Sequence, residues 1–286
     1  MEESWTSLKL IRWTTDFFEK KGIPNPRLDA ELLLAHALKC QRIDLYTAHE
    51  RKIPEKELAK YRTLVERRAK REPLQQIIGE TEFYGLKIKV TPDVLIPRPE
   101  TELLVEEGLK LKARDILEIG TGSGCLAVAL AKNLPEARVV ATDISEKALA
   151  VARENAKFHG VEKQIKFILA DIAPWKAFKA EEKKFDLIVS NPPYIPTGDF
   201  ESLQPEVRDF EPRGALEGGP EGLSCIRQII EEAPSSLNSN GFLVIEIGED
   251  QSEPLRKEWE RASHLLLQGF RKDWGEIERI VIFKKR

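Results

Sequence analysis

An apolar run that stops at two prolines places the strongest constraint on the fold of this chain. Residues 185–189 are apolar at four of five positions, and Ser190 and Asn191 then lead into Pro192 and Pro193. Such a run is typical of a strand that is buried on both faces of a sheet. Proline lacks the N–H group that a sheet ladder requires, so the strand must end there. We therefore expect Asn191 to lie at the edge of a sheet.

This strand end offers a small group of hydrogen-bond acceptors. The side-chain oxygen of Asn191 and the carbonyls of the proline segment are not used by a ladder, and together they suit a planar NH2 group. Tyr194 adds a flat ring beside them. Two interpretations stay open from these residues alone: a site that binds an NH2 group, or a strand followed by an ordinary proline-rich loop.

A glycine-rich turn lies upstream, between an apolar strand at 115–119 and a helical pattern that continues to about residue 131. This arrangement is typical of the first strand and helix of a nucleotide-type site. The turn consists of Gly120, Thr121, Gly122, Ser123 and Gly124. Its spacing differs from the Gly-x-Gly-x-x-Gly of dinucleotide folds, and no Gly-Lys-Ser/Thr follows. A redox cofactor and ATP are therefore disfavoured.

Two further strands each end at an acid. Residues 137–142 lead into Asp143, which lies 23 positions after Gly120, where the second strand of a doubly wound sheet presents an acid to ribose hydroxyls. Asp143 or Ser145 could instead cap the helix that begins at 146, and we favour Ser145 as the cap. Residues 164–169 lead to Asp171 and an apolar neighbour, Ile172. Three strand ends are thus expected at one ligand.

Together these segments resemble the seven-stranded S-adenosylmethionine-dependent methyltransferases, and in particular the peptide chain release factor N5-glutamine methyltransferase family. The resemblance covers about residues 73–251. It rests on five segments: Leu-Ile-Pro-Arg-Pro-Glu-Thr-Glu at 95–102, the glycine turn, Asn-Pro-Pro-Tyr-Ile at 191–195, Glu-Pro-Arg-Gly-Ala-Leu-Glu-Gly-Gly at 211–219 with Gly-Leu at 222–223, and Glu-Ile-Gly at 246–248 with Gln251.

The resemblance implies a reaction and a set of site residues. The enzyme would transfer a methyl group from S-adenosylmethionine to the glutamine side-chain nitrogen of the Gly-Gly-Gln motif in class 1 release factors, without a metal. The implied catalytic residues are Asn191, Pro192 and Tyr194, and the implied substrate pocket adds Pro193, Leu95 and Arg98. The implied cofactor-binding residues are Gly120, Thr121, Gly122, Ser123, Gly124, Asp143, Ile144, Asp171, Ile172 and Asn191. Arg98 and Glu100 would brace the pocket wall, or form a purely structural ion pair.

The chain is expected to fold in two parts joined by a hairpin. Apolar residues recur at helical spacing in 5–21, 28–38 and 54–71, with Pro54 suited to a first helical position. Residues 82–90 read as a β-hairpin that turns near Gly85. We therefore expect a helical substrate-docking domain at 1–75, a hairpin linker at 76–98 and an α/β methyltransferase domain at 99–286. Its doubly wound sheet should have seven strands, the last antiparallel.

Composition and charge narrow the partners. No apolar run approaches the ~20 residues that span a bilayer, the first residues resemble neither a signal nor a transit peptide, and the three cysteines are isolated. A cytoplasmic monomer without a metal is therefore expected. The net charge of −3 argues against dedicated DNA binding. Residues 60–71 are rich in lysine and arginine, which predicts either a solvated helix face or a docking surface for an acidic partner.

Three alternative functions stay open. Asn-Pro-Pro-Tyr would equally serve an adenine amino-methyltransferase on nucleic acid, because an exocyclic amine is also a planar NH2 group and can stack on Tyr194. A ribosomal protein glutamine is a second acceptor that fits the same motifs. A non-catalytic adapter that binds S-adenosylmethionine and a translation partner is the third.

Overall fold

The chain folds into two units in the computed structural model, which describes residues 5–47, 52–172, 184–259 and 264–286. The first unit comprises Met1–Gly79 together with Pro205–Phe210, and the second comprises Glu80–Gln204 and Glu211–Arg286. A six-residue segment between strands of the second unit therefore packs with the first. Among the described residues, no helix has both the length and the apolar composition needed to cross a membrane.

The first unit is helical. Its described helices are α1 (Ser7–Lys20), α2 (Pro26–Leu38), α3 (Asp44–Thr47), α4 (Glu55–Ala69), α5 (Leu74–Ile78) and α10 (Pro205–Arg208). The apolar faces of α1, α2 and α4 share one core, in which Phe18, Leu34 and Tyr61 are almost completely buried. The sequence predicted α1, α2 and α4 but not the three short helices α3, α5 and α10. Pro54 is the N-cap of α4 and not its first helical residue, so that expectation was wrong by one position.

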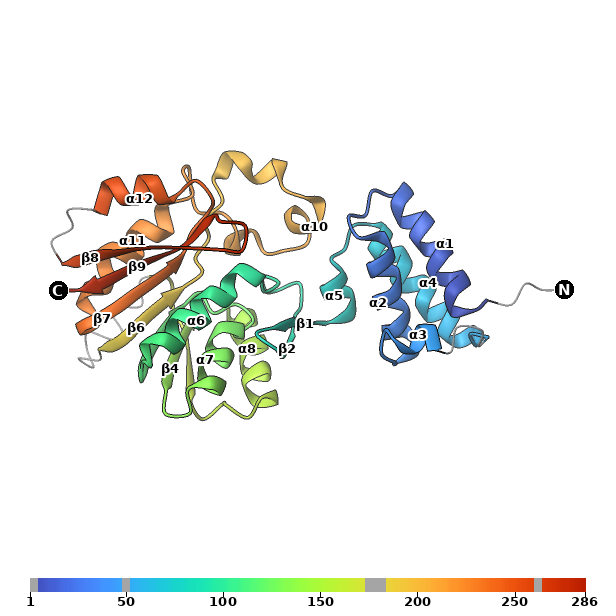
Figure 1. Cartoon of the computed structure of the whole chain (residues 1–286), viewed down its shortest axis with the longest axis horizontal. Coiled ribbons are helices and arrows are strands. Elements are labelled where there is room, and N and C mark those ends of the chain that lie inside the picture. Colours follow the sequence, from blue (N-terminus) through green and yellow to red (C-terminus); the bar gives the residue numbers. More distant parts are fainter. Residues whose placement is uncertain (1–4, 48–51, 173–183, 260–263) are drawn as a thin grey trace. The chain divides into compact units, whose positions relative to one another are not determined.

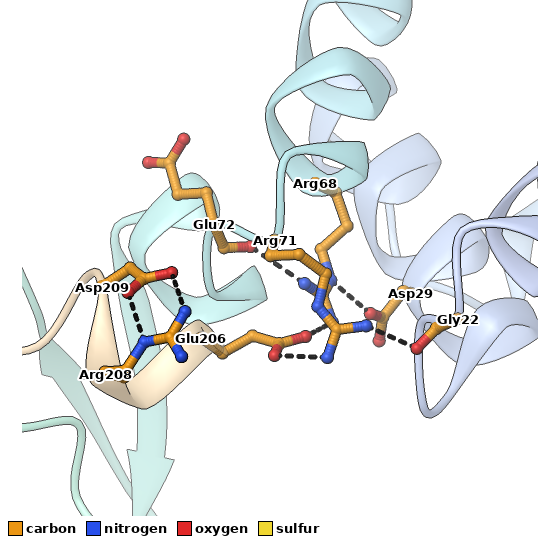
Figure 2. A network of polar contacts seen from close by, with 8 residues as sticks. All are labelled: Gly22, Asp29, Arg68, Arg71, Glu72, Glu206, Arg208 and Asp209. Carbon is orange, nitrogen blue, oxygen red and sulfur yellow. Dashed lines mark hydrogen bonds and ion pairs between the residues drawn. The ribbon is translucent and has the colours of Figure 1, made fainter. Parts of the chain in front are cut away.

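A buried network of ion pairs joins four segments of the helical unit (Figure 2). Arg68 donates from Nε to Asp29 at 2.7 Å and from Nη2 to Glu206 at 3.0 Å. Arg71 donates from Nη2 to the second carboxylate oxygen of Glu206 at 2.7 Å and from Nη1 to the Gly22 carbonyl. The Arg68 side chain is only 5% exposed. These charges therefore hold α10, which the chain contributes from far along the sequence, against α4.

This network corrects the interpretation of the basic segment at 60–71. Arg68 is buried, Arg71 is partly buried, and Arg67 is paired with Glu72. Lys60 and Arg62 do lie on the exposed face of α4. Arg68 therefore belongs to the interior of the unit, whereas Lys60, Arg62 and Lys70 remain exposed and available as a solvated or docking face.

The second unit is built on one sheet. Within the described residues its seven strands lie in the order β5-β4-β3-β6-β7-β9-β8. Their bounds are β3 (Asp115–Ile119), β4 (Arg138–Asp143), β5 (Ile165–Leu169), β6 (Phe185–Ser190), β7 (Leu237–Glu246), β8 (Leu265–Lys272) and β9 (Glu278–Lys285). Strand β9 runs antiparallel to β7 and β8, and the other paired strands are parallel. The predicted fold class is therefore confirmed.

Helices cover both faces of this sheet (Figure 1). They are α6 (Glu102–Leu111), α7 (Cys125–Asn133) and α8 (Glu146–Phe158) on one face, and α11 (Ser224–Glu232) and α12 (Ser252–Trp259) on the other. Consecutive strand residues alternate between these two cores: Leu187 packs with the first group of helices and Ile188 with the second. This double burial explains why β6 reads as a nearly continuous apolar run.

Shorter elements complete the second unit. The hairpin of β1 (Glu80–Phe83) and β2 (Leu86–Lys89) turns through Tyr84 and Gly85, both with positive φ, as the sequence predicted near Gly85. Single turns of 3-10 helix occur at η1 (Pro99–Thr101), η3 (Arg213–Ala215) and η4 (Ala233–Ser235), and a longer one at η2 (Thr197–Ser202). Strand β8 continues to Lys272 and pairs with β9 over most of its length.

The strand register determines which residues meet at the edge of the sheet. Ile119 is level with Thr142 on one side and with Ser190 on the other, and Ser190 is level with Ile245. Because these strands are parallel, the residues that directly follow these level positions in the sequence lie along one edge of the sheet. These residues are Gly120, Asp143, Asn191 and Glu246.

The buried arginine of the helical unit gives a test of this fold. Arg68→Met leaves the Asp29 carboxylate without its counter-charge and Glu206 with Arg71 alone, and breaking a buried pair in this way costs about 3–5 kcal/mol. We expect hydrogen exchange of the α2 and α4 amides to accelerate accordingly. The control Arg62→Met removes a 60% exposed guanidinium from the same helix and should change exchange little. Equal exchange in the two variants would contradict the described network.

Candidate functional site

The glycine turn after β3 is held by backbone hydrogen bonds. The N–H groups of Gly120 and Thr121 both donate to the Thr142 carbonyl at the end of β4, at 2.9 and 2.8 Å. Gly122 has a φ of +53°, and a Cβ atom placed there would meet nothing within 4 Å. The turn therefore presents an open backbone surface toward the edge of the sheet, where a ligand can approach closely.

Asp143 braces this turn from the neighbouring strand. One carboxylate oxygen accepts the Gly122 N–H at 2.8 Å, and the other accepts the Ser145 N–H at 2.9 Å. The Ser145 hydroxyl accepts from Ala148 N at 3.2 Å, so Ser145 is the N-cap of α8, as predicted. Burial raises the pKa of Asp143. Each carboxylate oxygen has further acceptor capacity, so the side chain can bind hydroxyl donors while it supports the turn.

Glu118 is a site residue that the sequence reasoning missed. It lies in β3 at 2% exposure, and its carboxylate accepts a hydrogen bond of 2.7 Å from the Thr121 hydroxyl. Burial raises the pKa of Glu118 to about 8. No basic side chain pairs with it in the part of the chain that the structure describes. The signal available in the sequence was a single acidic residue within an apolar strand. Because no base pairs with Glu118 in the described structure, the site suits a ligand that carries positive charge.

A small pocket joins the glycine turn to the end of β6. Its lining includes Leu95, Arg98, Thr101, Glu118, Gly122 and Asn191. Asn191 donates from Nδ2 to the Thr101 hydroxyl oxygen at 3.0 Å. Within the described residues, no donor reaches its Oδ1, which is therefore free to accept from a ligand. The structure thus brings Asn191, Leu95 and Arg98 together with the glycine turn.

The proline segment after Asn191 is fixed by Gln251. This side chain donates from Nε2 to the carbonyls of Tyr194, at 2.9 Å, and Gly222, at 3.1 Å, and its Oε1 accepts from Gly248 N. Gly222 approaches so closely that a Cβ atom there would overlap the Tyr194 carbonyl. The glycine and glutamine motifs downstream of the strand therefore serve to hold the backbone of residues 191–194 in place.

Tyr194 and Arg98 have partners that the sequence did not predict. The Tyr194 hydroxyl donates to the buried carboxylate of Glu246 at 3.4 Å, and burial raises the pKa of this phenol. Arg98 pairs with Glu211 at 2.5 Å, and Glu211 also accepts from Ile96 N at 2.9 Å. The ion pair between Arg98 and Glu100, which the sequence left open as an alternative, does not occur in the described structure, where the Arg98 guanidinium pairs with Glu211 instead.

The remaining predicted residues do not line this pocket. Ile144 follows Asp143 and is 70% exposed, so it can pack against a flat ligand at the end of β4. Asp171 is exposed after β5, and one of its oxygens accepts from the Ile172 N–H. Pro192 is buried, and Pro193 is partly exposed. No cluster of three potential metal ligands occurs among the described residues.

Comparison with known proteins places this fold and site in a class. Residues 9–79 match the family model of the PrmC N-terminal domain, and residues 99–203 match that of the methyltransferase small domain. The hMettl16 catalytic domain, solved in complex with the MAT2A 3′UTR hairpin 6, has a similar fold at a TM-score of 0.54 and 17% identity, over 80% of this chain and 81% of that one. The second unit is therefore a methyltransferase domain.

Curated relatives identify the family. The release factor glutamine methyltransferase of Geobacter sulfurreducens is 49% identical over 256 residues, which are 88% of this chain and 87% of that protein. The release factor glutamine methyltransferase of Rhodopirellula baltica is 44% identical over 251 residues, 85% of this chain and 84% of that protein. The chain belongs to the release factor glutamine methyltransferase family.

Proposed function

We propose that this chain transfers a methyl group from S-adenosylmethionine to the side-chain amide nitrogen of the glutamine in the Gly-Gly-Gln motif of class 1 release factors. The observation that carries the proposal is the Asn191 amide, whose nitrogen is engaged by Thr101 and whose oxygen faces no donor in the described structure. Family membership supplies the acceptor. A glutamine preceded by two glycines could reach a recessed acceptor pair, because the glycines allow the backbone a close approach.

The residues at the edge of the sheet fit the cofactor. Asp143 would accept from the ribose hydroxyls, the open backbone at Gly122 would lie against the ligand, and Glu118 would offset its positive charge. The rest of the proposed cofactor-binding set comprises Gly120, Thr121, Ser123, Gly124, Ile144, Asp171, Ile172 and Asn191. When bound, S-adenosylmethionine supplies a methyl group that is already activated by its sulfonium.

The protein's own task is then to position a weak nucleophile. An amide nitrogen attacks poorly because its lone pair is delocalised into the carbonyl. The Asn191 Oδ1 and the Pro192 carbonyl would accept its two N–H bonds, hold the nitrogen in place and stabilise its developing positive charge. The nitrogen becomes acidic as it is methylated and would then release one of these two protons, so that the product amide is neutral. Tyr194, Pro193 and Leu95 would enclose the glutamine side chain, while Arg98, held by Glu211, would support the pocket wall.

A methylation assay tests the proposed function. The chain is incubated with S-adenosylmethionine and, in parallel, with a folded release factor, ribosomes and a nucleic acid, and the products are analysed by mass spectrometry. We expect one methyl group on the Gly-Gly-Gln glutamine, and a turnover at least about 100-fold lower in Asn191→Ala, the scale for one preorganised electrostatic group. Methylated adenine, or a methylated ribosomal glutamine with an unmodified release factor, would support the corresponding alternative instead.

A comparison of two ligands in the parent chain and in one variant tests whether Asp143 binds the ribose or only supports the glycine turn. Asp143→Ala removes both the ribose contact and the support of the turn. The binding free energy for S-adenosylhomocysteine should therefore weaken by about 2–4 kcal/mol, the value of two hydrogen bonds to a carboxylate. Calorimetry with S-adenosylhomocysteine and its 2′-deoxy analogue divides these contributions. We expect the parent chain to prefer the 2′-hydroxyl form and Asp143→Ala to lose that preference. An unchanged preference in the variant would limit Asp143 to a structural role.

The helical unit would hold the protein substrate. We propose that residues 1–75 dock the release factor, 76–98 link the parts and 99–286 carry out the transfer, in a cytoplasmic monomer. An apolar surface on the unit supports this role: Trp13 is 52% exposed and stacks on Phe17 at 5.4 Å beside Trp5. Exposed aromatic residues of this kind often supply much of the binding energy in protein interfaces.

A pair of tryptophan variants tests this docking role. Trp13→Ala should raise the KM for the folded release factor about 10-fold or more, consistent with an interface anchor, but should leave the rate on a short Gly-Gly-Gln peptide unchanged. Trp274→Ala is the matched control, because Trp274 is 99% exposed in the turn before β9. Equal KM values for the two variants would remove the Trp13 surface from substrate docking.

A further inference from the structure

A chain of hydrogen bonds leads from the partly buried acceptor asparagine through two buried side chains into the protein. Asn191 Nδ2 donates to Thr101 Oγ1 at 3.0 Å, and Thr101 Oγ1 donates to Glu246 Oε2 at 2.7 Å. Thr101 is 4% exposed and Glu246 is 1% exposed. The three residues come from the end of β6, the start of α6 and the end of β7, so the fold brings them together from distant parts of the sequence.

The direction of these hydrogen bonds follows from the charge on Glu246. An ionised carboxylate can only accept, so the Thr101 hydroxyl must give its single hydrogen to Glu246. Only a lone pair of the hydroxyl then faces Asn191. The amide must therefore present its NH2 group to Thr101 and turn its Oδ1 away, because the reverse orientation would set two acceptors against each other.

We propose that Thr101 and Glu246 are positioning residues, which fix the orientation of the Asn191 amide so that its oxygen faces the methyl acceptor. This inference rests on the proposed function, in which the acceptor is an NH2 group. A flipped amide would point its own NH2 group at the substrate nitrogen and could not accept from it. Thr101 and Glu246 therefore act on the reaction through Asn191, to which they are joined by hydrogen bonds.

The same arrangement makes the amide orientation sensitive to pH. The groups that face Glu246 are the Thr101 and Tyr194 hydroxyls, the Glu100 carboxylate and the Arg279 guanidinium, and burial raises the pKa of Glu246 to about 7. Below that pKa the protonated carboxyl can donate to Thr101, whose hydrogen is then free to turn toward Asn191. The constraint on the amide is lost, so turnover is expected to fall as the pH decreases through about 7.

Variants of Thr101 test the proposal. Thr101→Val keeps the shape but removes the hydroxyl, and it should lower kcat about 10- to 100-fold, the range expected for a misplaced reacting group. The KM for S-adenosylmethionine should stay near its parent value. Thr101→Ser restores the hydroxyl and should restore most of the turnover. Thr14→Val is the matched control, because Thr14 is a fully buried threonine in α1 and outside the site.

A second measurement keeps the proposal testable if Thr101→Val does not fold. Glu246→Gln cannot ionise, so the decline of kcat below about pH 7 that we expect of the parent chain should be absent in this variant. Normal turnover in a folded Thr101→Val, or the same decline in Glu246→Gln, would overturn the proposal. The proposed function would still stand in that case, since it fails only if the parent chain leaves the release factor glutamine unmodified.

Discussion

The rest of this site depends on the strand register, which brings the ends of four parallel strands to the same level. The register of β3, β4, β6 and β7 places Gly120, Asp143, Asn191 and Glu246 along one edge of the sheet. A shift of one residue in any of these strands would turn its side chains to the opposite face and separate the groups. The two apolar cores, which bury alternate residues of each strand, make such a shift costly. The chemistry at the edge is therefore stabilised by packing in the interior.

Carboxylates determine how this edge is organised. Asp143 supports the glycine turn, Glu118 lies beneath it, and Glu246 orients the hydroxyl that meets Asn191. Burial raises the pKa of each of them. The helical unit uses charge in another way, since Arg68 and Arg71 bind Glu206 from the segment that follows the proline motif. Buried charges thus set local geometry in both units.

Periodicity and strand-ending residues were enough to predict the sheet and the ends of β3, β4 and β6, which meet at the site. The two prolines located Asn191, and the glycine turn located the neighbouring strand end, because both signals are local in the sequence. The Ser145 cap was predicted correctly for the same reason. The partners of Arg98 and Arg68 could not be predicted, because Glu211 and Glu206 are 113 and 138 residues away from them. Only the fold decides which distant acid meets which arginine, and Glu246 at the end of β7 was overlooked as a partner of Thr101 for that reason.

The central claim is that the Asn191 amide oxygen accepts the nitrogen that becomes methylated. A crystal structure of the chain with S-adenosylhomocysteine and a release factor tests it most directly. The account predicts the glutamine nitrogen of Gly-Gly-Gln within hydrogen-bond distance, about 2.7–3.2 Å, of both Asn191 Oδ1 and the Pro192 carbonyl. A glutamine bound elsewhere, or an Asn191 amide that turns its NH2 group toward the substrate nitrogen, would contradict it.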